Sequence, residues 1–171
     1  MMNLPFALPE LDLSAPLDRH RARVKREWID GNGHMNVGYY VVAFDQASDT
    51  LGEQLGFSWD YTRAKLGMIF ILEAHVTYDR ELLPDAPFRV TSQILDHDEK
   101  RLHVFHQMFH ADEGFLAATN ELVILHVDYE TRRAAPWPAP IAKRIAAMAG
   151  AHKNLQWPDK AGRTISLKRK R

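Results

Sequence analysis

The sequence predicts an α+β fold in which one long helix packs on one antiparallel sheet. One stretch has apolar residues at helical spacings of three and four, and four later segments change to a period close to two. The breaks between those segments are short and rich in Pro, Asp and Gly, which suits antiparallel hairpins. With 171 residues, the chain has the length of one globular domain.

The first elements follow from local signals. Residues 1–22 contain three prolines between short apolar groups and are expected to form an irregular arm over the body. A short strand is expected over residues 23–28 (RVKREW), before a dense turn. The long helix is expected over residues 37–55, with Asn36 as its N-cap and Gly56 as its C-terminal cap.

The later elements complete one sheet. Four strands are expected at 67–79, 87–97, 101–111 and 115–130, followed by a short helix near 141–150. The predicted domain therefore spans residues 23–150, and residues 151–171 form a basic tail. One helix cannot cover both faces of five strands, so we expect a homodimer or a homotetramer, formed by strand addition at an edge or by stacking of sheets.

Composition excludes several classes of protein. The chain has 22 basic and 22 acidic residues and no cysteine, so a disulfide framework, a zinc-thiolate site and a cysteine nucleophile are impossible. Residues 159–171 carry six basic residues and one acidic residue, which leaves 16 basic against 21 acidic residues elsewhere. The mildly acidic body argues against nucleic-acid binding, and the KRKR end is expected to be a disordered, solubilising tail.

No membrane association is expected either. The start of the chain lacks the positive region of a signal peptide, and the longest uncharged run, residues 31–44, is too short to span a bilayer. We therefore expect a cytoplasmic protein.

The segment from Asp30 to Tyr40 (DGNGHMNVGYY) holds the best candidates for chemistry. A carboxylate, a histidine (His34) and an amide (Asn36) lie on a glycine-rich turn that leads into the long helix. Unpaired backbone N–H groups at a helix N-terminus suit an oxyanion formed when a carbonyl is attacked. Asp30 is near enough to act as general base or nucleophile. The alternative is an ordinary turn, in which Asn36 only caps the helix and His34 packs beneath it.

The pattern D-x-x-G-H-M-N-x-x-x-Y resembles the signature of hotdog-fold thioesterases of the 4-hydroxybenzoyl-CoA thioesterase type; it is formed here by Asp30, Gly33, His34, Met35, Asn36 and Tyr40. In that family the pattern lies between the first strand and the central helix, and the order of elements agrees through about residue 130. The resemblance implies a hotdog fold, an acyl-CoA substrate, no cofactor and active sites at subunit interfaces.

The same resemblance assigns roles to individual residues. Asp30 matches the carboxylate that attacks the thioester or activates a water molecule. The backbone around Gly38, Tyr39 and Tyr40 would polarise the thioester carbonyl. Many relatives have Asn-Asn where this chain has Asn36-Val37, so any role of the second amide is absent here.

A second resemblance is narrower. Residues 28–36 (WIDGNGHMN) and 95–106 (LDHDEKRLHVFH) look like thioesterases that hydrolyse betainyl-CoA in carnitine degradation. Such an acyl group carries a trimethylammonium cation, which needs an aromatic or acidic pocket. The candidates for that pocket, each of which could instead be ordinary core or interface, are Trp28, Tyr39, Tyr40, Trp59, Phe70 and Glu73.

Glu73 interrupts an apolar strand, MIFILEAHV. Regular alternation would place it on one face with Ile69, Ile71 and His75. A carboxylate beside isoleucines is costly unless it is paired or faces a water-filled cleft. Glu73 is therefore either a second catalytic candidate or one half of a charge pair with an arginine across a subunit interface.

Two other groups of residues, the histidines and the basic pairs, give weaker evidence for a functional site. His103, His106 and His110 cannot converge from one strand, so no metal site is expected. The phosphates of CoA could meet the cations of Lys100 and Arg101, or those of residues 63–65 or 132–133.

Two other functions stay open. Hotdog hydratases and dehydratases resemble an Asp-x₄-His arrangement, and Asp30 and His34 are one residue short of that spacing. A non-catalytic acyl-CoA-binding module is the second alternative. Nothing resembles a helix-turn-helix.

Overall fold

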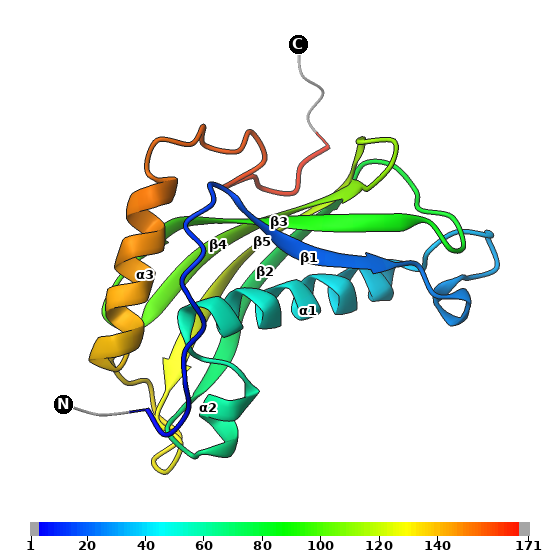
Figure 1. Cartoon of the computed structure of the whole chain (residues 1–171). Coiled ribbons are helices and arrows are strands. Elements are labelled where there is room, and N and C mark those ends of the chain that lie inside the picture. Colours follow the sequence, from blue (N-terminus) through cyan, green and yellow to red (C-terminus); the bar gives the residue numbers. More distant parts are fainter. Residues whose placement is uncertain (1–3, 168–171) are drawn as a thin grey trace.

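The computed structural model describes residues 4–167, and its centre is a five-stranded antiparallel sheet with strand order β1-β3-β4-β5-β2 (Figure 1). The strands are β1 (Leu17–Arg23), β2 (Met68–Tyr78), β3 (Pro87–His97), β4 (Arg101–His110) and β5 (Leu116–Val127). Helix α1 (Val37–Leu55) crosses one face of the sheet (Figure 1). The predicted α+β class and the four later strands are confirmed, with ends shifted by up to three residues.

The remaining elements are short. They are the single turn η1 (Arg26–Trp28), α2 (Trp59–Arg63) and α3 (Ala139–His152), which stands at the end of the sheet near β3 (Figure 1). The strand expected over residues 23–28 is wrong, because β1 ends at Arg23 and pairs with β3 before that point. The exposed side of β1 carries charged residues, so residues 17–22 did not resemble a strand and were expected to belong to the irregular arm.

Helix α1 is fixed at both ends by its caps. The Asn36 side chain accepts a hydrogen bond from the Gly38 N–H at 3.0 Å. Gly56 follows the helix with φ +100°, a conformation that glycine adopts without strain. The predicted helix over residues 37–55 is therefore confirmed at both ends.

The core lies between α1 and the β1 side of the sheet. Helix α1 packs on β1, β3 and β5, and its buried face includes Phe44 and Leu51. Beneath the helix, His106 Nδ1 lies 2.8 Å from the Ser92 hydroxyl, and Nε2 lies 3.0 Å from the Ser48 hydroxyl. Burial lowers the pKa of His106 to about 3, so this imidazole is neutral and sealed in the core.

A β-bulge changes the faces of β2. Ile71 pairs with Ile124 of β5 and Glu73 pairs with Val123, so Leu72 is the extra residue. Ile71 therefore lies on the face toward α1, whereas Glu73 and His75 lie on the opposite face. The predicted grouping of Ile69 and Ile71 with Glu73 and His75 is wrong, because regular alternation does not survive the bulge.

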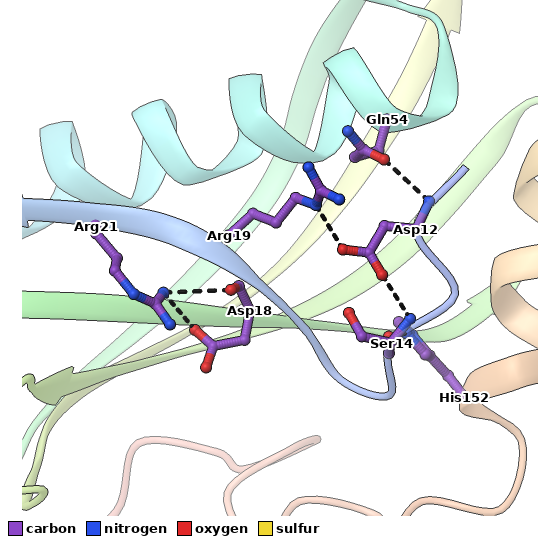
Figure 2. A network of polar contacts seen from close by, with 7 residues as sticks. All are labelled: Asp12, Ser14, Asp18, Arg19, Arg21, Gln54 and His152. Carbon is purple, nitrogen blue, oxygen red and sulfur yellow. Dashed lines mark hydrogen bonds and ion pairs between the residues drawn. The ribbon is translucent and has the colours of Figure 1, made fainter. Parts of the chain in front are cut away.

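Segments near both ends of the described chain pack on the body. In the N-terminal arm, the Asp12 N–H donates to Gln54 of α1 at 3.1 Å, and the Ser14 carbonyl lies 3.0 Å from His152 of α3 (Figure 2). At the other end, residues 153–167 cross the sheet face opposite α1 (Figure 1). Trp157 packs edge-on against His103 there, with ring centroids 6.2 Å apart.

The expectation of a disordered tail therefore does not hold for the part of this segment that contacts the sheet. The KRKR end itself lies outside the described residues. Within residues 4–167, no helix is long and apolar enough to cross a membrane.

Candidate active site

The loop before α1 is a tight hydrogen-bonded turn. The Asp30 N–H donates to the His34 carbonyl at 3.1 Å, and the Gly33 N–H donates back to the Asp30 carbonyl at 3.0 Å. Gly33 has φ +83°, which favours glycine at this position. The loop thus returns on itself and places the Asp30 side chain beside the start of the helix.

Asn36 connects the Asp30 carboxylate to the helix. Its Nδ2 donates to Asp30 Oδ2 at 3.3 Å, while its Oδ1 accepts from the Gly38 N–H. The other carboxylate oxygen, Oδ1, accepts from the Asn32 N–H at 2.8 Å. Asp30 is half-buried, so its carboxylate is held in one orientation and stays accessible to a ligand.

The backbone amides at the helix start are unequally available. The Gly38 N–H is used by the Asn36 side chain, and the Tyr39 N–H donates to the Asn36 carbonyl at 3.0 Å. The Val37 N–H has no acceptor among residues 4–167. The Val37 N–H is therefore one amide that could bind an oxyanion, and the expected role of the backbone at residues 38–40 stays a prediction.

Three aromatic residues support the loop. Trp28 and Tyr39 stack with ring centroids 5.4 Å apart, and the Trp28 carbonyl accepts the Asn36 N–H at 2.8 Å. Tyr40 is buried, and its hydroxyl accepts the Leu82 N–H at 3.0 Å. The candidates Trp28, Tyr39 and Tyr40 therefore all lie at the loop–helix junction.

A cleft of about 310 Å³ opens beside this junction. One wall contains His34, Met35, Val37 and Tyr40, and the other is formed by residues 78–81. The rings of Tyr40 and Tyr78 meet at 83°, with centroids 5.3 Å apart. His34 lies at the rim of the cleft, with Nε2 4.0 Å from the Glu81 carboxylate.

Sequence reasoning missed Tyr78 and Glu81. They follow Asp30 by more than forty residues, and no local motif marks them. Only the fold brings the end of β2 against the start of α1.

Several other candidates lie elsewhere. Glu73 lines a separate cleft on the opposite face of the sheet, with His103, Glu121 and residues 162–164. Trp59 bonds to Asp49 at 3.2 Å, and Phe70 lies exposed on edge strand β2. The structure therefore does not bring Glu73 to the Asp30 loop in one protomer.

The proposed CoA cations lie at the far end of the sheet. Lys100 is in the β3–β4 turn and Arg101 is the first residue of β4, whereas the Asp30 loop lies near the start of β3. Lys100 lies 3.3 Å from Glu99, and Arg101 lies 2.6 Å from Asp98. In one protomer these cations are thus distant from Asp30 and already have acidic partners.

The histidines that invited a metal interpretation are separated. His103 lies 2.8 Å from Glu121, and His126 lies 2.9 Å from the Tyr61 hydroxyl. His106 is in the core and His110 lies near Glu113. No cluster of three or more His, Cys, Asp or Glu side chains suited to a metal ion occurs within the described chain.

Comparison with known proteins identifies the family. The model of the thioesterase-like superfamily matches residues 24–145. A betainyl-CoA thioesterase from Pseudomonas aeruginosa is 34% identical over 155 residues, which cover 91% of this chain and 98% of that protein. An L-carnitine dehydrogenase/betainyl-CoA thioesterase from Ruegeria pomeroyi is 37% identical over 164 residues, but the match spans only 33% of its length.

Solved structures agree with these relatives. A protein from Staphylococcus aureus, solved in complex with CoA, aligns with a TM-score of 0.83 and 30% identity over 90% of this chain and 98% of that one. A thioesterase from Synechocystis with 15% identity still aligns with a TM-score of 0.67, which supports the fold alone. The expected hotdog fold is therefore confirmed, and this chain is a thioester hydrolase that belongs to the thioesterase-like superfamily.

Proposed function

We propose that this protein hydrolyses betainyl-CoA to free CoA and glycine betaine, with Asp30 as the residue that attacks the thioester or activates water. The observation that carries the proposal is the loop–helix junction. There, Asn36 connects the Asp30 carboxylate to the start of α1, and Val37, whose N–H is free, lines a partly aromatic cleft. The betainyl-CoA thioesterase that matches almost over its full length supports the choice of acyl group.

The chemistry needs only groups of the protein and water. In the general-base route, Asp30 takes a proton from water while the oxygen attacks the thioester carbonyl. The Val37 N–H stabilises the negative charge that develops on the carbonyl oxygen. The C–S bond then breaks, and the proton held by Asp30 passes to the leaving thiolate. In the nucleophilic route, Asp30 forms a mixed anhydride that water hydrolyses to the same products.

The uncovered side of the sheet supports a homodimer formed through β2. Strand β2 is an edge strand with free backbone groups, and its residues 70–74 are exposed. Large apolar residues on β2 and on the adjacent side of α1 are 41–55% exposed; they are Val37, Val41, Phe70, Ile71 and Leu72. Monomeric proteins rarely leave such a patch in water.

Antiparallel pairing of two β2 strands would also combine distant parts of the site. It places the start of one β2 beside the end of the other, and thus brings the Lys100–Arg101 end of one protomer toward the Asp30 loop of its partner. These cations could then bind CoA phosphates across the interface. Residues 153–167 occupy the opposite face, which favours a dimer over a tetramer of stacked sheets.

The decisive experiment replaces Asp30 by Asn. Because the amide cannot act as base or nucleophile, we expect release of free thiol from betainyl-CoA to fall by about 10³-fold, the middle of the range for a general base. The unfolding midpoint in urea should change little, since Asp30 is partly exposed and the amide oxygen of Asn can still accept the Asn32 N–H. Asp60→Asn is the matched control, because Asp60 forms an exposed ion pair with Arg63 and should keep full turnover.

The thiol assay and a second substrate separate the alternatives. Full thiol release by Asp30→Asn would exclude the proposed mechanism. Binding of acyl-CoA esters without thiol release by the wild type would favour a binding module. With an enoyl-CoA as substrate, loss of enoyl absorbance while the thioester stays intact would favour a hydratase.

A further inference from the structure

We propose that the cleft between the first turn of α1 and residues 78–81 selects a quaternary ammonium group in the acyl part of the substrate, with Tyr40 and Tyr78 as its aromatic contacts and Glu81 as its counter-charge. This inference rests on the proposed function and deepens it, because it names the residues that would distinguish a cationic acyl group from a neutral one.

The charges around the cleft leave one carboxylate available. Asp79 forms an ion pair with Lys160, and Arg80 lies 3.5 Å from Glu113 and over the ring of Phe115. These two residues therefore already have partners of opposite charge. Glu81 differs from them.

Glu81 has only a weak partner. The nearest basic group that the structure gives it within residues 4–167 is His34 Nε2, at 4.0 Å. Its side chain is 59% exposed, so it can turn toward a ligand in the cleft. A cation bound there would therefore meet an uncompensated carboxylate.

The aromatic walls suit a cation that carries no N–H. A quaternary ammonium group cannot donate a conventional hydrogen bond and binds instead to the faces of aromatic rings. Tyr40 and Tyr78 both line the cleft and meet edge to face, with Tyr40 buried at its base and the exposed ring of Tyr78 offering most of the aromatic surface.

Hydrogen bonds hold both rings in this arrangement. The Tyr40 hydroxyl accepts the Leu82 N–H at 3.0 Å, and the Tyr78 hydroxyl donates to the Val37 carbonyl at 3.4 Å. Burial, with a smaller contribution from the charge of Glu81, raises the pKa of Tyr40. Both residues line the same cleft, so the carboxylate and this ring can act on the same ligand.

The position of the cleft matches the length of the acyl group. In a betainyl thioester, a single methylene separates the ammonium nitrogen from the carbonyl carbon. Val37 lines the cleft and also supplies the free N–H at the helix start. When the carbonyl oxygen binds that N–H, the trimethylammonium group therefore lies within the same cleft.

The test compares two substrates of the same shape. In 3,3-dimethylbutanoyl-CoA a carbon replaces the nitrogen of betainyl-CoA, so the two esters differ in charge and hardly in size. The quantity measured is the ratio of kcat/KM for the cationic ester to kcat/KM for the neutral one, from thiol release by the full chain. This ratio removes effects that act equally on both esters, such as partial loss of folded enzyme.

We expect the wild type to prefer the cationic ester and the variants to lose that preference. Glu81→Gln should lower the ratio about fivefold, and Tyr78→Leu about fivefold, as expected for cation contacts at a partly exposed site. Tyr78→Phe keeps the aromatic face and should retain most of the ratio. Glu130→Gln is the matched control, because this exposed residue lies in the turn after β5, and its ratio should equal that of the wild type.

Two results would overturn the inference in different ways. If betainyl-CoA is hydrolysed and both Glu81→Gln and Tyr78→Leu keep the wild-type ratio, the cleft does not bind the cation, although the proposed function stands. If the wild type hydrolyses the two esters equally well, neither the cleft nor any other part of the protein selects a cation. The thioesterase assignment would stand, but betainyl-CoA would no longer be the preferred substrate.

Discussion

The two edges of the sheet differ in how they meet water. Strand β1 has seven residues, and charged side chains such as Arg21 and Arg23 line its exposed side. Helix α1 covers its inner face. Strand β2 has eleven residues and exposes Phe70, Ile71 and Leu72 in its first half. Charged, short edges resist pairing, whereas a long apolar edge invites it. The molecule therefore has one protected edge and one edge suited to a partner.

The two sides of the molecule also differ in role: the β1 side forms the stable core, and the β2 side holds the candidate active site. On the β1 side, α1 seals His106 between Ser48 and Ser92, where it is neutral and inaccessible. Where α1 starts, its flank toward β2 borders the open cleft, which His34 lines, and Asp30 is partly exposed in the loop just before the helix. A histidine with hydroxyl partners resembles catalytic machinery, yet here burial makes it part of the core. The candidate site instead lies where the helix leaves the sheet uncovered.

The largest effect on assembly and activity is expected from a charge placed on the β2 edge. Ile71→Lys would place two lysines near the proposed two-fold contact and add like-charge repulsion to lost apolar burial. Sedimentation velocity should show monomers, and thiol release should fall at least about tenfold because the site would lose the partner's contribution. Urea unfolding should show that the monomer remains folded. An Ile71→Lys protein that is dimeric and fully active would move the interface away from β2.

An intermediate effect, on the free energy of unfolding, is expected from the buried β1 side as pH falls. The pKa of His106 is lowered to about 3 by burial, whereas an unfolded histidine titrates near 6.5. Below pH 6.5 the unfolded chain therefore binds a proton at His106 that the folded chain does not. The free energy of unfolding should decrease on acidification, by up to about 1.4 kcal/mol per pH unit for this one proton.

Urea unfolding at pH 5.0–6.5 measures this dependence. His20, His126 and His152 also have lowered pKa values from burial and contribute in the same direction. The His106→Asn variant should therefore show a slope shallower by about one proton, rather than no slope. The native imidazole resonances of His106 should not titrate down to pH 5. A protonation seen there at pH 6 would mean that the β1 side is open.

The parts of the fold that the sequence predicted are those with local causes. Helix α1 was predictable because its spacing and both caps, Asn36 and Gly56, are contiguous in the chain. The Asp30 loop was found for the same reason. The bulge at Leu72 was not predictable, because it depends on pairing with residues of β5 about fifty positions later. Tyr78 and Glu81 were missed because only tertiary packing brings them to the Asp30 loop.

The smallest effect is expected from the protected edge, and it tests whether the two edges truly differ. Arg23 lies near the end of β1 and donates from its guanidinium to the Asp85 carbonyl at 2.9 Å, at an exposed position. Arg23→Ala should change the free energy of unfolding by no more than about 0.5 kcal/mol, as for most surface substitutions. Sedimentation velocity should still show a dimer, and kcat/KM should match that of the wild type. If Arg23→Ala instead produced larger assemblies, the charge of Arg23 by itself would be what keeps the β1 edge unpaired.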